Sequence, residues 1–265
     1  ASLKDGRWAK VNSCFQDPSC QNPDPDLLME VTVPAGQTTA NIMFNQSGNP
    51  EFITSRVNAY YHGTHIHNWI KERLPTFTAI DLPLPFSVNV VSTACNAGYS
   101  PQQISTGYLK SGSVVLPQTG LMHNCINMAM DTVIYHEYGH FLDDMAGGLS
   151  SAGFGGYIAE GWGDLMGSYV SGQPIIAENA IAPTIPGPGV FPRYANNNYQ
   201  FNQMNGSYKY GEMWAGFGWH LRENLMNHYP GTGQRKAEEM MVALLAVNPE
   251  TIIWAIFDLF LLDDD

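Results

Sequence analysis

The chain has 265 residues and a formal net charge of −12, and its composition is 44% hydrophobic but only 14% charged. This composition excludes a disordered chain, and the charge excludes nucleic-acid binding through a basic surface, because phosphates need a clustered positive field. The acidity also argues against attraction to anionic membranes, and its simplest consequence is solubility.

The first half of the chain predicts an irregular arm, one helix and several extended segments. The arm covers the polar residues 1–30 and leads into a short strand over 28–33. Apolar residues at helical spacing predict a helix over 51–73, which Pro75 ends. Alternating and β-branched residues predict a strand over 86–91, and a second extended segment follows over 104–116.

The second half is predicted to be helical. Helices are expected over 126–145, 158–170, 210–227 and 234–246, with a last helix that starts at Asn248-Pro249-Glu250 with proline in the first helical position. Its apolar stretch, 251–262, is too short to span a bilayer and predicts a buried core helix. A Pro/Asn/Gly loop over 172–206 is long enough to favour a functional role.

This order of elements predicts an α+β fold with two lobes that meet near Gly147–Gly148. We expect an N-terminal lobe over 1–147 with a β-sheet and the helix over 126–145. A mainly helical C-terminal lobe would cover 148–265.

The four cysteines, Cys14, Cys20, Cys95 and Cys125, lack the spacing of a zinc site. An even count favours two disulfides in a secreted protein, and of the three connectivities we favour Cys14–Cys20 with Cys95–Cys125. Four buried free thiols in a cytosolic protein are the alternative. Because Ala1 is not an initiator methionine, we also expect a precursor with a pro-segment.

The segment from His136 to His140 reads H-E-x-x-H. On a helix these histidines lie one turn apart on one face, where both imidazoles can bind one zinc ion. Glu137, beside the first histidine, occupies the general-base position. Apolar residues at 133–135 predict that the helix is buried, and burying two histidines and a carboxylate without a partner is costly, so a metal is favoured.

A catalytic zinc site also needs a third protein ligand and one open position. Glu160 follows the second histidine by 20 residues and is expected near the start of the next helix, as the third ligand. Asp164, one turn later, can orient His136 by accepting its second ring N–H, and Asp144 can act similarly near His140. The alternative for Glu160 is an ordinary carboxylate at a helix N-terminus.

The pattern of H-E-x-x-H, a 20-residue gap and E-x-x-x-D resembles the glutamate-zincin peptidases, the thermolysin-like and fungalysin-like families. The forms H-E-Y-G-H and E-G-W-G-D are closer to the fungalysin-like side. The resemblance implies a two-lobed zincin with one catalytic Zn²⁺ that cleaves proteins or peptides. It also implies that Asn96 and Ala97 lie on an edge strand that binds the substrate backbone.

Further roles follow from the same resemblance. Tyr208 matches a histidine that hydrogen-bonds the tetrahedral intermediate, and a phenol can donate the same bond. Tyr210 or His220 are alternatives for this role, and all of these aromatics could instead belong to the core. Outside this match, Arg193 is a candidate to support a substrate carbonyl. The calcium-binding acidic residues of thermolysin-like enzymes have no matching positions here.

The sequence therefore predicts a secreted, monomeric zinc endopeptidase with Glu137 as general base. The alternative is a catalytically inactive, zinc-stabilised secreted binding protein. His62, His65 and His67 lack a convincing metal spacing and predict a surface helix that carries histidines.

Overall fold

The fold is taken from a computed structural model. It describes residues 2–14, 35–36, 50–91, 96–101, 112–119, 126–148, 155–178, 180, 192–201, 206–249 and 251–263. The predicted strand over 28–33 lies outside these residues. Among the described helices, none combines the length and the hydropathy that a membrane span requires.

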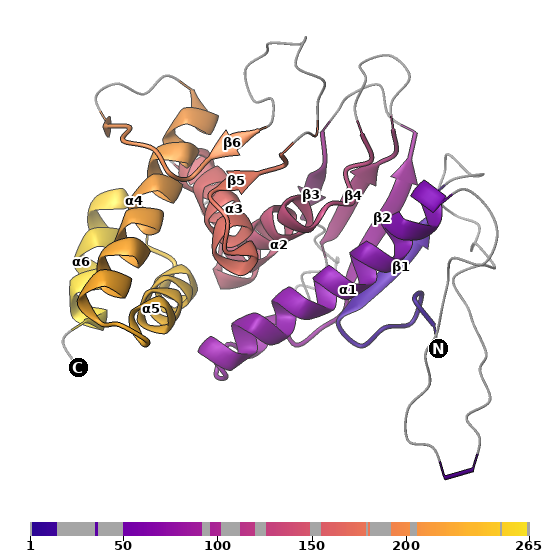
Figure 1. The fold of residues 1–265 in the computed structure, drawn as a ribbon, viewed down its shortest axis with the longest axis horizontal. Helices are drawn as coiled ribbons and strands as arrows, with labels where there is room; N and C mark the ends of the chain where they lie inside the picture. The colour runs from indigo at the N-terminus through magenta and orange to yellow at the C-terminus, as the bar shows by residue number, and fades with distance from the viewer. Residues whose placement is uncertain are drawn as a thin grey trace.

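A four-stranded sheet occupies one side of the molecule (Figure 1), with the strand order β1-β2-β4-β3. Its strands are β1 (Ala9–Ser13), β2 (Leu84–Val90), β3 (Gly98–Ser100) and β4 (Ser113–Pro117). The pairs β1–β2 and β2–β4 are parallel, whereas β3 runs antiparallel to β4 at the edge. An edge strand leaves its outer backbone groups available for other partners.

Two helices connect this sheet to the rest of the molecule. Helix α1 (Pro50–Arg73) packs on β1 and β2, while α2 (Asp131–Ala146) packs on α1, on β3 and on the short 3-10 helix η2 (Thr78–Ile80). Figure 1 shows α2 between the sheet and the C-terminal helices. Core side chains such as Phe86, Ile134 and Phe141 are fully buried here. The predicted α+β class is confirmed.

The remaining helices follow one another in space as they do along the chain: α3 packs on α2, α4 on α3, α5 on α4 and α6 on α5. They are α3 (Gly155–Ser171), α4 (Ser207–His228), α5 (Gly233–Val247) and α6 (Ile252–Leu262). The predicted loop over 172–206 also contains a small antiparallel pair, β5 (Ile175–Ile176) and β6 (Arg193–Tyr194).

Several predicted boundaries were wrong. The arm over 1–30 contains β1, which has only two apolar residues and gains its place by pairing with β2. Helix α2 begins at Asp131 rather than 126, because the preceding residues hydrogen-bond elsewhere: Ile126 N–H donates to Ala180 O and Met128 N–H to Pro117 O.

The last helix differs most from its prediction. It begins after Thr251, whose hydroxyl accepts a hydrogen bond from Trp254 N–H, while Asn248 instead ends α5 in the left-handed conformation. Within α6 only Ala255 and Leu259 are buried, so the prediction of a buried core helix was wrong. Its large apolar side chains are mostly exposed, for example Phe260 at 69%.

The prediction of a histidine-bearing surface helix was also wrong in part. His67 on α1 is buried, stacks on Trp8 with ring centroids 3.8 Å apart, and lies 3.4 Å from Asp81. His62 is partly buried, and its Nδ1 lies 2.7 Å from the Tyr135 hydroxyl oxygen. These histidines therefore take part in packing between α1 and its neighbours.

Candidate metal centre

The two motif histidines face the same point from one side of α2. His136 is buried and His140 partly buried, and their Nε2 atoms lie 3.0 Å apart. The one-turn spacing places both rings on the helix face that meets α3. Burial lowers the pKa of both imidazoles, which favours the neutral form that binds metals.

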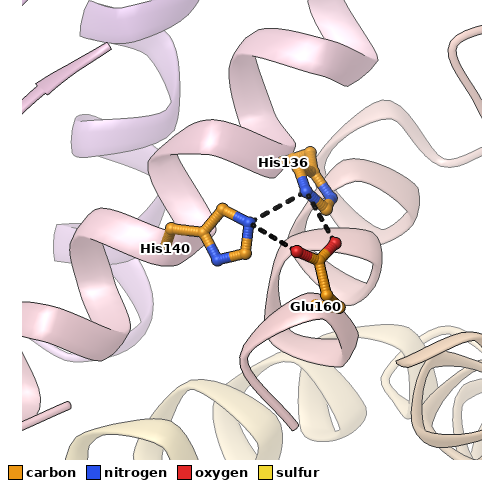
Figure 2. Close-up of side chains that lie close together, drawn as sticks. All are labelled: His136, His140 and Glu160. Atoms are coloured by element: carbon orange, nitrogen blue, oxygen red, sulfur yellow. Dashed lines mark hydrogen bonds and ion pairs between the residues drawn. The ribbon is translucent and has the colours of Figure 1, made fainter. Parts of the chain in front are cut away.

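Glu160 completes the cluster from α3, as Figure 2 shows. Its Oε2 lies 3.7 Å from His136 Nε2, and its Oε1 lies 3.8 Å from His140 Nε2. Around a tetrahedral zinc, two ligand atoms are roughly 3.3–3.6 Å apart, which follows from bonds of about 2.0–2.2 Å. Within the described ranges these three side chains form the group with metal-ligand spacing, so they could hold a metal ion.

Two glycines allow α3 to approach the histidines this closely. A Cβ atom on Gly139 would lie 2.8 Å from Gly163 Cα, and one on Gly163 would lie 2.4 Å from the His136 ring. Any side chain at either position would separate α2 from α3. The glycines of the two motifs thus set the distance between the histidines and Glu160.

Asp164 supports the buried side of His136. Its Oδ1 lies 2.9 Å from His136 Nδ1, whereas His136 Nε2 faces His140, Glu160 and the Arg193 guanidinium, whose Nη2 lies 3.0 Å away. A ligating histidine commonly donates its second ring N–H to a carboxylate, and this contact fixes the tautomer. Burial raises the pKa of Asp164 to about 6, while the positive charge of Arg193 counteracts that shift. Asp164 thus lies close to His136, and its predicted role in orienting that ring stays a prediction.

Arg193, on β6, is buried against the same carboxylates. Its Nη1 lies 2.6 Å from Glu160 Oε2, and its Nε lies 3.0 Å from Asp164 Oδ1. A buried guanidinium with two carboxylate partners is well compensated electrostatically. In this structure Arg193 holds acidic side chains of the centre in place, and its predicted contact with a substrate carbonyl stays a prediction.

Glu137 lies in the same region but is not part of the metal-ligand group. It is only 3% exposed, and burial together with the charge of Glu160 raises its pKa to about 8. Its carboxylate accepts a hydrogen bond from the Tyr99 backbone N–H, and Oε2 has no hydrogen-bond partner among the described residues. A bound divalent cation would lower this pKa, because a nearby positive charge favours the ionised form.

Helix α4 places Tyr208 beside this centre. The Arg193 guanidinium lies 5.4 Å from the centre of its ring, and the pKa of the phenol is raised by burial and by the charge of Glu160. The two alternatives have other neighbours: Tyr210 packs edge-on against Phe201, and His220 lies 2.9 Å from Asn197 O through Nε2. The geometry therefore favours Tyr208 of the three.

The remaining predicted residues lie around the edge strand. Asn96 is exposed and Ala97 buried, and both directly precede β3. Asp144 accepts a hydrogen bond of 2.8 Å from the Tyr99 hydroxyl, so it connects α2 to β3; its predicted role near His140 stays a prediction. Sequence reasoning missed Tyr99, because its link to Glu137 runs through a backbone N–H that every residue type except proline carries.

The disulfide prediction is tested at one position. Cys14 is fully buried and disulfide-bonded, while the other three cysteines lie outside the described residues. The connectivity stays a prediction.

The chain matches no protein-family model and no curated protein sequence. Its function must therefore be argued from the chemistry of this centre.

Proposed function

We propose that the chain is a zinc-dependent endopeptidase of the glutamate-zincin type. The observation that carries the proposal is the convergence of His136, His140 and Glu160, with a buried carboxylate, Glu137, outside the ligand set. Two imidazoles and one carboxylate are a common set for catalytic zinc, whereas structural zinc sites usually have four ligands and are rich in cysteine. The two-lobed arrangement, with the centre between sheet and helices, belongs to the same proposal.

When bound, zinc would activate a water molecule for attack and polarise the substrate carbonyl. The protein supplies the proton transfers. Glu137 accepts a proton from the attacking water and delivers it to the leaving amine. A bound cation would keep its buried carboxylate ionised for the first of these steps. Asp164 fixes the His136 tautomer through the 2.9 Å contact.

Other residues bind the substrate, stabilise the oxyanion or hold the metal ligands in position. Tyr208 donates a hydrogen bond to the oxyanion that develops at the carbonyl. The substrate lies extended along the edge that includes Asn96, Ala97 and β3, because the outer side of an edge strand offers unpaired backbone groups. Arg193 holds Glu160 and Asp164 in position around the histidines.

The test combines metal analysis with hydrolysis of unfolded casein. The purified chain should bind one zinc per molecule and cleave casein, and a chelator should stop the cleavage. Glu137→Gln should keep the zinc but lower turnover about 10³-fold, within the range for removing a general base. Glu72→Gln, whose side chain is 68% exposed, is the matched control and should be fully active.

The alternative, a zinc-stabilised binding protein, gives a different result. Such a protein would bind zinc but leave casein intact, and Glu137→Gln would change nothing. Zinc binding without chelator-sensitive cleavage would therefore refute the peptidase proposal.

A further inference from the structure

Tyr99 is held firmly in place at the edge of the sheet. Its hydroxyl donates a hydrogen bond of 2.8 Å to Asp144 Oδ2 on α2. Its ring packs near Phe141, with centroids 6.1 Å apart. The same hydroxyl lies close to Gly112, where a Cβ atom would lie 2.0 Å from the hydroxyl oxygen. Burial and the adjacent carboxylate raise the pKa of this phenol, so it stays a donor.

The backbone of the same residue touches the general base. The Tyr99 N–H donates to the Glu137 carboxylate, whose other oxygen, Oε2, has no hydrogen-bond partner among the described residues. Glu137 and Asp144 are seven residues apart on α2, two helical turns along one face. One residue of β3 thus contacts α2 twice, through its side chain at Asp144 and through its backbone at Glu137.

Strand β3 needs such an anchor. It is three residues long and, among the described residues, pairs with β4 alone, so its own ladder restrains it weakly. The contact of the phenol with Asp144 ties the strand to the helix that carries the catalytic motif. Without that contact, the backbone N–H that restrains Glu137 would move with the edge strand.

We propose that Tyr99 is a positioning residue: its hydroxyl, bound to Asp144, fixes β3 so that the Tyr99 N–H holds the Glu137 carboxylate in its working orientation. Tyr99 acts through Glu137 and needs no contact with the substrate. The kinetic part of this inference rests on the proposed peptidase function, whereas the restraint itself does not.

The experiment compares Tyr99→Phe, Asp144→Ala and the double variant with wild type. Tyr61→Phe, at an exposed tyrosine on α1, is the matched control. The first readout is native-state hydrogen exchange of the residue-99 amide, measured by NMR on the zinc-loaded chain. The second is kcat and KM for casein-derived peptides at equal zinc content.

We expect the residue-99 amide to exchange roughly tenfold faster in Tyr99→Phe and in Asp144→Ala, because local opening becomes easier. It should also lose protection in Glu137→Ala, which removes its acceptor. The kcat should fall about tenfold with KM unchanged, since small misplacements of a catalytic group are costly. The kcat of the double variant should be no lower than that of the more impaired single variant, because both substitutions break the same contact.

Unchanged exchange at residue 99 in both single variants would overturn the inference, whatever the enzyme activity. A raised KM and a lower melting temperature with unaltered kcat would also overturn it, because they would indicate a purely structural role. If wild type shows no peptidase activity, the proposed function fails, and the exchange data still decide whether Tyr99 restrains Glu137. Asp144→Ala tests the same contact from α2 if Tyr99→Phe folds poorly.

Discussion

Polar side chains are usually exposed and apolar side chains buried. The α2–α3 pair and helix α6 both depart from this rule, in opposite directions. The pair buries His136, Glu137 and Asp164, whereas α6 exposes Trp254 at 57% and Leu261 at 73%. Buried ionisable groups are tolerated where partners compensate them, and each of these three has a neighbour on a facing element. In the part of the chain that the structure describes, helix α6 packs on α5 and lines a cavity of about 840 Å³ together with α4 and residues 197–201.

The difference shows that composition alone does not determine burial. The helices that carry the buried ionisable side chains are central because α1, the sheet and α4 surround them, and the apolar helix α6 is peripheral because little of the described chain covers it. We therefore expect substitutions of the buried ionisable side chains in the α2–α3 pair to impair the chemistry of the centre. Substitutions on the outer face of α6 should impair neither this chemistry nor folding.

The largest effect is expected from Gly163→Ala. The new methyl group would lie within 2.4–2.8 Å of the His136 ring and force α2 and α3 apart, so zinc binding and peptidase activity should both be lost. Zinc stoichiometry and casein hydrolysis measure this. Gly98→Ala, where a Cβ meets nothing within 4 Å, should still bind one zinc. Normal zinc binding by Gly163→Ala would show that the close helix contact is not required.

Within α6, Leu259→Ala tests the inner face. Leu259 is 8% exposed, so removing its side chain should lower the free energy of unfolding by about 2–3 kcal/mol. Urea denaturation measures the loss. An effect below about 0.5 kcal/mol, typical of surface substitutions, would mean that α6 contributes little to folding on either face.

Asp164→Asn tests the contribution of a buried polar side chain in the α2–α3 pair. The amide cannot carry the charge that pairs with His136 and Arg193, so zinc affinity should fall about 10–100-fold while the fold is retained. Competition with a chelating dye measures the affinity, and circular dichroism checks the fold. Wild-type affinity would refute the assigned role of Asp164.

The smallest effect is expected from Phe260→Ser on the outer face of α6. Phe260 is 69% exposed, so the free energy of unfolding should change by less than about 0.5 kcal/mol and the zinc content should not change. The same urea denaturation used for Leu259→Ala provides the direct comparison. A loss comparable to that of Leu259→Ala would show that Phe260 is covered in solution.

Much of the centre could be predicted from residue spacing. The i, i+4 relation of His136 and His140 guarantees a shared helix face, and Glu160 with Asp164 repeats that relation on the next helix. Spacing could not show that Arg193 would lie against both carboxylates, because a guanidinium 29 residues beyond Asp164 could lie anywhere around the fold. Nor could it find Tyr99, whose contact with Glu137 is made by the backbone.

The sequence by itself determined the helical periodicity of α1 and of the α2–α3 pair, the metal-ligand types and their spacing, since these depend on local geometry within each helix. Tertiary structure alone decided which ligand atoms converge, because that depends on the approach of α2 to α3 at Gly139 and Gly163. It also decided that α6 is exposed and that β1 is a strand. Burial and strand pairing arise from contacts between segments distant in sequence, which no local pattern encodes.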